Sequence, residues 1–307
     1  MAQFSIVIPC FNAATTILET LESIRAQTLT DWEVICVDDG SQDYASVSVA
    51  VAALNDPRIK LERNEGKGPS AARNFGAMIH ATAPIIAFCD ADDVWAQGKL
   101  ADLAIGFADK SVDAIYGQIA FFNDRTADAR VFSTVPNQDL TIQMLLGENP
   151  VCTMSNVAVR RTVFVDMNGF DEKIVHNEDL EWLIRLVGQG ARVVGLDRLH
   201  VWYRTSTSGL SADLGAMAAA RTAVTAAVMR FGVASTPASD AIHYRYLARR
   251  ALRLGQGRTV ALRFAVLGIL KSPGGFFDVP FRGGLTLAGA VARLFMPRAL
   301  ALSLFAR

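Results

Sequence analysis

Two short runs of carboxylates, each directly after an apolar stretch, constrain the fold of this chain more than any other feature. Asp38-Asp39 follows the run 32–37, and Asp90-Ala91-Asp92-Asp93 follows the run 84–89. Apolar runs of this length, rich in β-branched residues, are typical of strands buried on both faces of a parallel sheet. In such a sheet ligands bind outside the carboxyl ends of the strands. We therefore expect both acidic runs at one ligand-binding edge.

Carboxylates crowded at a sheet edge repel one another unless a positive charge lies between them. Mg²⁺ and Mn²⁺ prefer hard oxygen ligands, so a divalent cation bound with a charged ligand is the expected partner. Two solvated acidic turns are the alternative, and either run alone would fit that interpretation about as well. The occurrence of both runs favours the cation.

Strand-type and helix-type segments alternate along the first two thirds of the chain. We expect strands at 4–9, 33–37, 58–62, 84–89, 114–122, 156–160, 191–196 and 199–203. Helices are expected with an apolar face of Ile17, Leu21 and Ile24, and near 44–54, 70–81 and 177–187. Thr15 or Thr16 and Asn177 are the expected caps. This alternation predicts βαβ units and a mainly parallel sheet, whereas residues 123–150 look mixed and rich in loops.

The charge distribution divides the chain into two regions. Formal net charge is zero over 307 residues, but residues 1–240 hold 19 Lys/Arg against 29 Asp/Glu. Residues 241–307 hold 11 Lys/Arg and one acid, Asp278. The chain from about 212 is rich in Ala, Arg and Leu and reads as helical. We predict a catalytic domain at 1–210 and a helical, basic and apolar extension at 211–307, because a basic tail often meets an anionic surface.

The cysteines and the hydropathy pattern indicate a reducing compartment and no simple membrane span. Cys10, Cys36, Cys89 and Cys152 form no C-x-x-C pair, and no His stands at metal-ligand spacing from them. We expect them to be small buried residues. No stretch of 18 apolar residues lacks a charge. The N-terminus leads straight into a predicted strand, so no signal peptide is expected.

Five segments in order give the chain a family resemblance. They are VIPCFNA, VDDGSQD, GKGPSAARNFG, FCDADD and HNEDLEWLIRL, within about residues 4–205. Together they resemble a family-2 glycosyltransferase. That resemblance implies a GT-A fold, a Rossmann-like and mainly parallel sheet flanked by helices. It also implies transfer of a sugar from a nucleotide-diphosphate donor, expected to be UDP-linked, to an acceptor hydroxyl with inversion.

The resemblance assigns the metal ligand and the catalytic base. The family's Asp-x-Asp motif maps to Asp90-Ala91-Asp92, with Asp92 as the ligand of Mn²⁺ or Mg²⁺, which offsets the developing charge of the leaving diphosphate. HNEDLEW resembles the motif that carries the general base, which maps to Asp179. From its place in the first turn of a helix we expect the helix dipole to lower the pKa of Asp179. The alternative is that Glu178 and Asp179 only favour the helix start.

The same resemblance assigns the donor pocket. Asp39 matches the position that accepts a hydrogen bond from the nucleotide base, and Asp38 is expected to do the same or to support the loop. Arg73 matches a residue near the donor phosphate or ribose, with a solvated helix arginine that pairs with nearby acids as the alternative. The remaining assigned donor residues are Pro9, Asn12, Asp90 and Ala91, with Asp90 placed near the ribose or the waters of the metal.

Accessory residues remain open between two interpretations. They are Asn74, Glu178, Lys67, Asp93 and Arg204. Lys67 meets either phosphate or water, and Asp93 either belongs to the site or caps the next helix. Arg204 belongs to 203–207, which resembles a loop that closes over pyrophosphate. His176 and His200 are considered for metal or phosphate contact, although lone histidines are more often structural. Phe11 reads as part of a plain turn, and Trp182 as core.

The basic tail suggests a membrane surface. Arg249, Arg250, Arg253, Arg258 and Arg263 alternate with apolar residues, which suits helices lying at an anionic lipid interface. The alternative is a tail packed on protein. We predict a peripheral enzyme at the cytoplasmic face of the cell membrane, acting in polysaccharide or glycolipid synthesis on a glycan or lipid-linked acceptor, with no nucleic-acid partner. A non-catalytic nucleotide-sugar-binding scaffold is the rival. A nucleotidyltransferase fits less well, because FNAATT lacks the Gly-rich basic loop expected after the first strand.

Overall fold

The structure is a computed structural model that describes residues 2–174, 177–205 and 214–305. His176, Ser206 and Thr207, which the sequence brought into question for the site, lie outside these ranges. The chain divides into two compact units. Unit 1 comprises residues 1–140 and 151–205, and unit 2 comprises 141–150 and 206–307. Segment 141–150 lies inside the region expected to be catalytic but belongs to the second unit.

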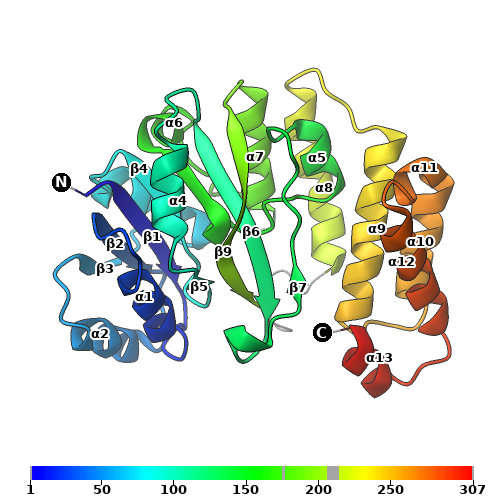
Figure 1. Cartoon of the computed structure of the whole chain (residues 1–307), viewed down its shortest axis with the longest axis horizontal. Helices are drawn as coiled ribbons and strands as arrows, with labels where there is room; N and C mark the ends of the chain where they lie inside the picture. Colours follow the sequence, from blue (N-terminus) through cyan, green and yellow to red (C-terminus); the bar gives the residue numbers. More distant parts are fainter. Residues whose placement is uncertain (1, 175–176, 206–213, 306–307) are drawn as a thin grey trace. The chain divides into compact units, whose positions relative to one another are not determined.

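Unit 1 is an α/β layer structure around one mixed sheet, as expected (Figure 1). The strands run in the order β3-β2-β1-β4-β8-β6-β9-β5, with β7 paired to β6. Their bounds are β1 Phe4–Cys10, β2 Trp32–Asp38, β3 Ile59–Arg63, β4 Ile85–Phe88, β5 Val94–Trp95, β6 Ala114–Phe122, β7 Val131–Phe132, β8 Val157–Arg160 and β9 Val193–Arg204. Strands β1 to β4 are mutually parallel, while β8 is antiparallel to both β4 and β6.

The helices of unit 1 follow the predicted alternation. They are α1 Ile17–Arg25, α2 Tyr44–Ala53, α3 Pro69–Asn74, the π-helix η1 Phe75–His80, α4 Lys99–Gly106, the 3₁₀ turns η2 Thr126–Asp128 and η3 Met154–Asn156, α6 Arg161–Asp166 and α7 Glu178–Gly188. Thr16 and Asn177 occupy N-cap positions, but neither forms a side-chain cap hydrogen bond. Asn177 instead takes a left-handed φ of 60°, which Asn tolerates better than most residues.

Alternate strand residues build two separate cores on the two faces of the sheet, as the period of two requires. Phe4, Ile6 and Ile8 of β1 face a core that includes side chains of α1, α2 and α4. On the opposite face an aromatic group packs together, with ring centroids 5.3–5.7 Å apart: Phe88, Phe164, Phe170 and Trp182. Figure 1 shows α1 and α4 in front of the sheet and α6 and α7 behind it. The core interpretation of Trp182, which is fully buried, is confirmed.

Segments 191–196 and 199–203, expected as two strands, form the single strand β9. It runs parallel to β6, with register shifts between Tyr116 and Gln118 and between Gln118 and Ile119. A Cβ at Gly117 would lie 2.4 Å from the imidazole of His200, so only glycine fits beside that ring.

Unit 2 is helical, with its own apolar core. It contains α5 Ile142–Gly147, α8 Leu214–Met229, α9 Pro237–Arg253, α10 Val260–Lys271, α11 Pro273–Phe276, α12 Pro280–Ala292 and α13 Arg298–Phe305. Leu247, Ala251 and Phe276 are among its buried residues. In the described part of the chain no helix is both long and apolar enough to cross a membrane.

Candidate active site

Both acidic runs lie at the carboxyl edge of the sheet, on either side of β1. Cys10 of β1 stands opposite Asp38 of β2, and the N–H of Asp39 donates to the carbonyl of Cys10 at 2.8 Å. On the other side β4 is parallel to β1, and the N–H of Cys89 donates to the carbonyl of Val7 at 3.1 Å. The expectation of one shared edge is therefore confirmed.

Arg73 joins the second acidic run to the start of α7. Its guanidinium donates through Nη2 to Asp90 Oδ1 at 2.6 Å and through Nη1 to Glu178 Oε1 at 3.1 Å. Arg73 is only 5% exposed, so the alternative of a solvated helix arginine is wrong, although its pairing with nearby acids is confirmed. Burial opposes the charged form, but Asp90 and Glu178 outweigh it and raise the pKa of Arg73. This arginine brings two carboxylate-bearing segments to one buried positive charge.

Asp90 is an anchoring residue whose two oxygens are both engaged. Besides Arg73, it accepts a hydrogen bond from Thr153 Oγ1 at 3.2 Å, and its backbone N–H donates to Ser155 Oγ at 2.8 Å. Cys152, just before, has a φ of +69°, a conformation that non-glycine residues rarely adopt. The turn 152–156 carried no motif that sequence reasoning could detect, because its role depends on contacts with residues more than sixty positions earlier.

Among the described residues the carboxylate of Asp92 forms no ion pair, unlike that of Asp90, which pairs with Arg73. Burial, then the neighbouring Asp90, raise the pKa of Asp92 to about 6. Arg204 approaches, but its Nε donates to the backbone carbonyl of Asp92 at 2.9 Å and not to the carboxylate. Within the described ranges no other side chain pairs with that carboxylate. A cation bound here would relieve both the desolvation and the repulsion from Asp90.

The site fits a divalent cation whose ligands come partly from the protein and partly from the substrate. Among the described residues there is no group of three or more His, Cys, Asp or Glu side chains arranged to hold a metal alone. Mg²⁺ sites in nucleotide enzymes need only one or two carboxylates, because waters and substrate phosphates supply the other oxygens. Asp92, with its uncompensated charge, supplies a donor of that kind.

Asp93 is a buried support and not a helix cap. Helix α4 begins only at Lys99, after an N-cap at Gly98, so the capping interpretation is wrong. Asp93 Oδ1 accepts from the N–H of Arg204 at 3.0 Å. Burial, then Asp90, raise the pKa of Asp93. Beneath it the buried Lys99 ammonium donates to the carbonyl of Ser155 and lies 3.9 Å from the centroid of the Trp95 ring; burial lowers the pKa of Lys99 to about 7.

The first acidic run separates into a supporting and an accessible carboxylate. Asp38 is 4% exposed, and its Oδ2 accepts from the N–H groups of Gly40 and Ser41 at 3.1 and 3.3 Å. Asp39 is half-buried and accepts from Asn64 Nδ2 at 2.7 Å and from the N–H of Gly68 at 2.8 Å. A carboxylate has about four lone-pair sites, so Asp39 retains capacity for a further donor.

The other residues expected at the donor pocket lie along the same edge. Asn12, with a φ of 51°, accepts through Oδ1 from the N–H of Gln42 at 2.9 Å and so ties the turns after β1 and β2 together. Pro9 is partly buried within β1, and Phe11 is 63% exposed beyond it. The carbonyl of Ala91 accepts from Thr20 of α1 at 3.1 Å, which fixes the backbone between the two aspartates of the motif.

Asp179 lies in the first turn of α7, but its acidity is opposite to expectation. Burial, then the charge of Glu178, raise the pKa of Asp179 to about 7. The N–H of Leu180 donates to Oδ1 at 2.7 Å and opposes this shift, as does Arg73. The expectation of a lowered pKa is wrong because the helix-terminus effect is about 0.3–1 kcal/mol at exposed sites, whereas loss of water around a carboxylate is worth several times more.

Two of the residues considered for the site, Asn74 and His200, have structural surroundings instead. Asn74 accepts from the N–H of Phe170 and donates to its carbonyl, at 2.8 and 2.9 Å, so it holds the turn before α7. His200 is fully buried, and burial lowers its pKa to about 3, which keeps the ring neutral beside Asp102 at 3.6 Å. Lys67 is exposed in the loop before α3. Arg204, by contrast, is brought to the acidic run and pairs with Glu19.

An open α/β sheet with acidic runs at the carboxyl ends of β2 and β4, and a further acidic pair at the start of α7, is the arrangement of a GT-A glycosyltransferase. The model of the family "Glycosyl transferase family 2" matches residues 5–167. The chain belongs to this family and is a glycosyltransferase.

Two curated relatives extend the match. The chain is 31% identical over 211 residues to the Escherichia coli UDP-Glc:alpha-D-GlcNAc-diphosphoundecaprenol beta-1,3-glucosyltransferase WfgD, covering 68% of this chain and 79% of that protein. It is 28% identical over 201 residues to the amylovoran biosynthesis glycosyltransferase AmsB of Erwinia amylovora, covering 62% and 66%.

Solved structures share the fold. Residues 1–349 of TarS from S. aureus, in complex with UDP-GlcNAc, superpose with a TM-score of 0.63 at 18% identity, covering 99% of this chain and 91% of that one. The mannosyltransferase PcManGT from Pyrobaculum calidifontis, in complex with GDP-Man and Mn²⁺, gives 0.59 at 20% identity, covering 99% and 84%.

Proposed function

We propose that this protein is an inverting, metal-dependent glycosyltransferase that moves a sugar from a UDP-sugar to a hydroxyl of a lipid-linked saccharide in envelope glycan synthesis. The observation that carries the proposal is that the buried Arg73 binds both Asp90 and Glu178, because these ion pairs hold the run that contains Asp92 close to the first turn of α7, which contains Asp179. WfgD acts from UDP-Glc on a diphosphoundecaprenol-linked sugar, which supports both the donor and the acceptor class.

The first acidic run would bind the nucleoside. Asp39 keeps one or more lone pairs for the imide N–H of uracil, while Asp38 and Asn12 hold the surrounding turns. PcManGT is described with a guanosine donor, and guanine also presents an N–H to a carboxylate. The UDP assignment therefore depends on WfgD and on the fit of Asp39, and a donor panel tests it.

The second run would receive the diphosphate. Asp92 would hold Mn²⁺ or Mg²⁺ together with phosphate oxygens, and the bound cation supplies neutralisation of the charge that develops on the leaving diphosphate. Asp90 and Asp93 orient the backbone around Asp92, and Arg204 closes one side of the run through its backbone contact. Arg73, expected at the donor phosphate, would act mainly by positioning Asp90 and α7.

Asp179 would accept the proton of the acceptor hydroxyl. As the hydroxyl oxygen bonds to the anomeric carbon, the bond from that carbon to the diphosphate oxygen breaks, and the diphosphate leaves with the electron pair. The proton moves to Asp179, which ends the step neutral. A base with a pKa of about 7 accepts that proton more readily than an ordinary aspartate and is still largely ionised at pH 8.

Unit 2 would hold the enzyme at a membrane surface. Its exposed large apolar side chains include Leu270, Phe281, Leu285 and Phe295, which are 57–82% exposed. Of the tail arginines expected to meet lipid, Arg258 and Arg263 are exposed, whereas the others are partly buried. A catalytic domain over 1–210 and an extension over 211–307, with 141–150 packed into the extension, is the proposed organisation.

The test is transfer from a panel of nucleotide-sugars to a lipid-extractable acceptor, with Mn²⁺ and with EDTA. We expect UDP-dependent, EDTA-sensitive transfer that is lost in Asp179→Asn. Donor binding without any transfer, unchanged by that substitution, would support the rival scaffold. Unimpaired transfer in EDTA would refute the metal role.

A further inference from the structure

Lys99 stands at a position that is unfavourable for a lysine in two ways. It is the first residue of α4, directly after the N-cap Gly98, where the helix dipole disfavours a positive charge. Its side chain is also fully buried, and within the described ranges no carboxylate oxygen lies at ion-pair distance from its Nζ. A buried charge without a paired counter-charge lowers stability. Residues that break local rules in this way are expected at functional sites.

The ammonium group of Lys99 holds a buried turn. Its Nζ donates a hydrogen bond to the carbonyl of Ser155 and lies 3.9 Å from the centroid of the Trp95 ring. Ser155 belongs to the 3₁₀ turn η3 and is itself fully buried. A carbonyl acceptor and an aromatic face are both favourable partners for an ammonium group. Lys99 thus links the start of α4 to η3.

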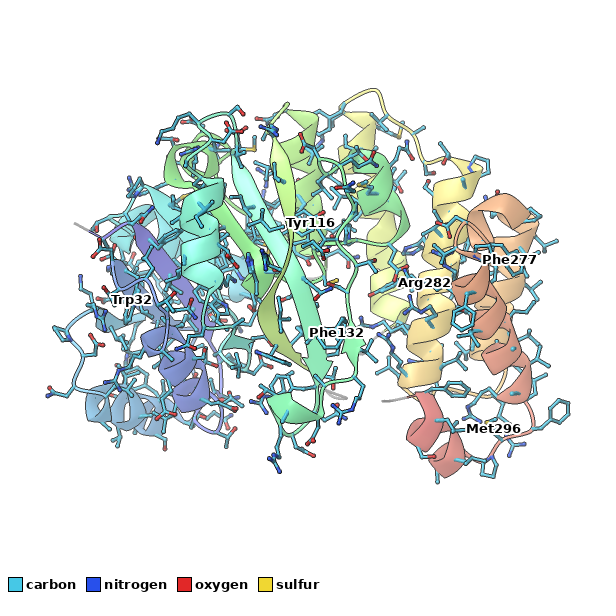
Figure 2. The ribbon with its side chains drawn as sticks, in the orientation of Figure 1. Trp32, Tyr116, Phe132, Phe277, Arg282 and Met296 are labelled. Carbon is cyan, nitrogen blue, oxygen red and sulfur yellow. The ribbon has the colours of Figure 1, made fainter. Side chains whose placement is uncertain are left out.

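The residue after Ser155 fixes the same turn to the sheet. Asn156 Oδ1 accepts from the N–H of Gly117 at 2.9 Å, and its Nδ2 donates to the carbonyls of Gly117 and Val151 at 2.7 and 3.0 Å. Gly117 lies on β6 next to Tyr116, which is labelled in Figure 2. The turn is therefore held by β6 through Asn156 and by α4 through Lys99.

This turn holds the first aspartate of the acidic run 90–93. Ser155 Oγ accepts from the N–H of Asp90 at 2.8 Å, and Thr153 Oγ1 donates to Asp90 Oδ2 at 3.2 Å. The carbonyl of Asp90 accepts from the N–H of Asp93 at 3.2 Å, which closes a β-turn that contains Asp92. A displacement of Ser155 would therefore reach Asp92 through the backbone of this β-turn.

We propose that Lys99 is a positioning residue for the metal ligand Asp92. Its ammonium group fixes Ser155, and Ser155 fixes the backbone of Asp90. This inference rests on the metal role of Asp92 in the proposed function. A single protein carboxylate that shares a cation with substrate oxygens has to be in place before they bind, so residues that fix its backbone contribute to affinity for the cation.

The experiment compares two test variants with two matched controls. Lys99→Met keeps the length of the side chain but removes its donor, and Ser155→Ala removes the acceptor of the Asp90 N–H. The control Lys60→Met makes the first substitution at an exposed position of β3. The control Leu103→Ala loosens the buried face of α4 without removing a hydrogen bond.

Two measurements are made on the full chain. Amide hydrogen exchange of the ligand-free protein is resolved at Asp90 with overlapping peptides. We expect this amide to exchange about tenfold faster in Lys99→Met and in Ser155→Ala, roughly the effect of one lost hydrogen bond, with no change at the amides of β2. Lys60→Met should match wild type, and any faster exchange in Leu103→Ala should extend over α4 without singling out Asp90.

UDP binding by calorimetry, with and without Mn²⁺, is the second measurement. We expect the gain in UDP affinity from Mn²⁺ to be about tenfold smaller in Lys99→Met and in Ser155→Ala than in wild type. UDP affinity without metal should stay within about twofold of wild type, and both controls should keep the full gain. A purely structural role for Lys99 would not separate the two affinities in this way.

Two additional variants test whether Lys99 acts through Ser155. The double variant Lys99→Met with Ser155→Ala should resemble Ser155→Ala alone, because residues that act in series are not additive. Lys99→Gln, which keeps an N–H donor, should give exchange at Asp90 between wild type and Lys99→Met.

Exchange at Asp90 that is no faster in Lys99→Met than in Leu103→Ala would overturn the inference. Effects of Lys99→Met and Ser155→Ala that simply add in the double variant would overturn it as well. Wild type that gains no UDP affinity from Mn²⁺ would instead refute the proposed metal role. The exchange measurement needs no ligand, so it still decides whether Lys99 holds Asp90 in that case.

Discussion

Replacing Asp179 with Asn should stabilise the protein while it abolishes transfer. The pKa of Asp179 is raised from 3.8 to about 7, so the folded state resists ionisation of this carboxyl. At 1.36 kcal/mol for each pH unit, full ionisation above pH 7 costs at most about 4 kcal/mol. Because Asp179 is partly exposed, we expect about half of that, near 2 kcal/mol, to be recovered in Asp179→Asn at pH 8.

The direction of the pKa shift determines how the stability gained by Asp179→Asn changes with pH. The pKa of Asp179 is higher in the folded protein than in the unfolded chain, so protonation of its carboxyl favours the folded state. This stabilisation is fully present below about pH 4 and is lost as the pH rises through 7. The advantage of Asp179→Asn should therefore shrink by about half between pH 8 and pH 5. Urea unfolding of both proteins at pH 5 and pH 8 measures this difference in stability. The transition to follow is the one that moves to higher urea concentration when UDP and Mn²⁺ are present.

The control for this prediction is Asp166→Asn, which replaces an exposed aspartate at the end of α6. It should leave both stability and transfer unchanged at either pH. Destabilisation by Asp179→Asn at pH 8, or a gain that is the same at pH 5 and pH 8, would refute the argument from burial. Retained transfer would remove Asp179 as the base.

Three further predictions concern the same edge of the sheet. Arg73→Met should lower the free energy of unfolding by about 3–5 kcal/mol, because it leaves Asp90 and Glu178 without their buried partner. Urea titration measures this loss, and a change below about 1 kcal/mol would show that the two ion pairs do not stabilise the fold. The value of kcat/KM should fall about tenfold per pH unit below pH 7 as Asp179 is protonated, whereas a flat profile down to pH 5.5 would contradict that titration. Gly169→Ala should destabilise by more than about 1 kcal/mol, since φ is +56° and its Cβ would lie 2.3 Å from Asn74 Oδ1; an unchanged melting temperature would refute the close packing.

The parallel half of the sheet could be predicted because its signals are local. Strands β1, β2 and β4 are short apolar runs, and acids follow β2 and β4, so local pattern alone places them. The π-helical turn η1 and the union of two expected strands into β9 depend on packing, including the fit of Gly117 against His200. Such features carry no local signature in the sequence.

The candidate site shows the same division. The acidic runs were visible in the sequence. The link from Asp90 through Arg73 to Glu178 was not, because Arg73 and Glu178 lie 105 residues apart in the chain. The sign of the pKa shift at Asp179 was predicted wrongly because position in a helix can be read from sequence, whereas desolvation cannot. Likewise Arg249 was expected at lipid, yet it contacts Glu148 of a segment about a hundred residues earlier.

The most direct test of the account is UDP binding by calorimetry as Mn²⁺ is added, comparing wild type with Asp92→Asn and Asp39→Asn. We predict that Mn²⁺ strengthens UDP binding in wild type and in Asp39→Asn, with Asp39→Asn weaker throughout, and that Asp92→Asn alone loses the response to Mn²⁺. An undiminished response to Mn²⁺ in Asp92→Asn would contradict the proposed division of labour between the two acidic runs.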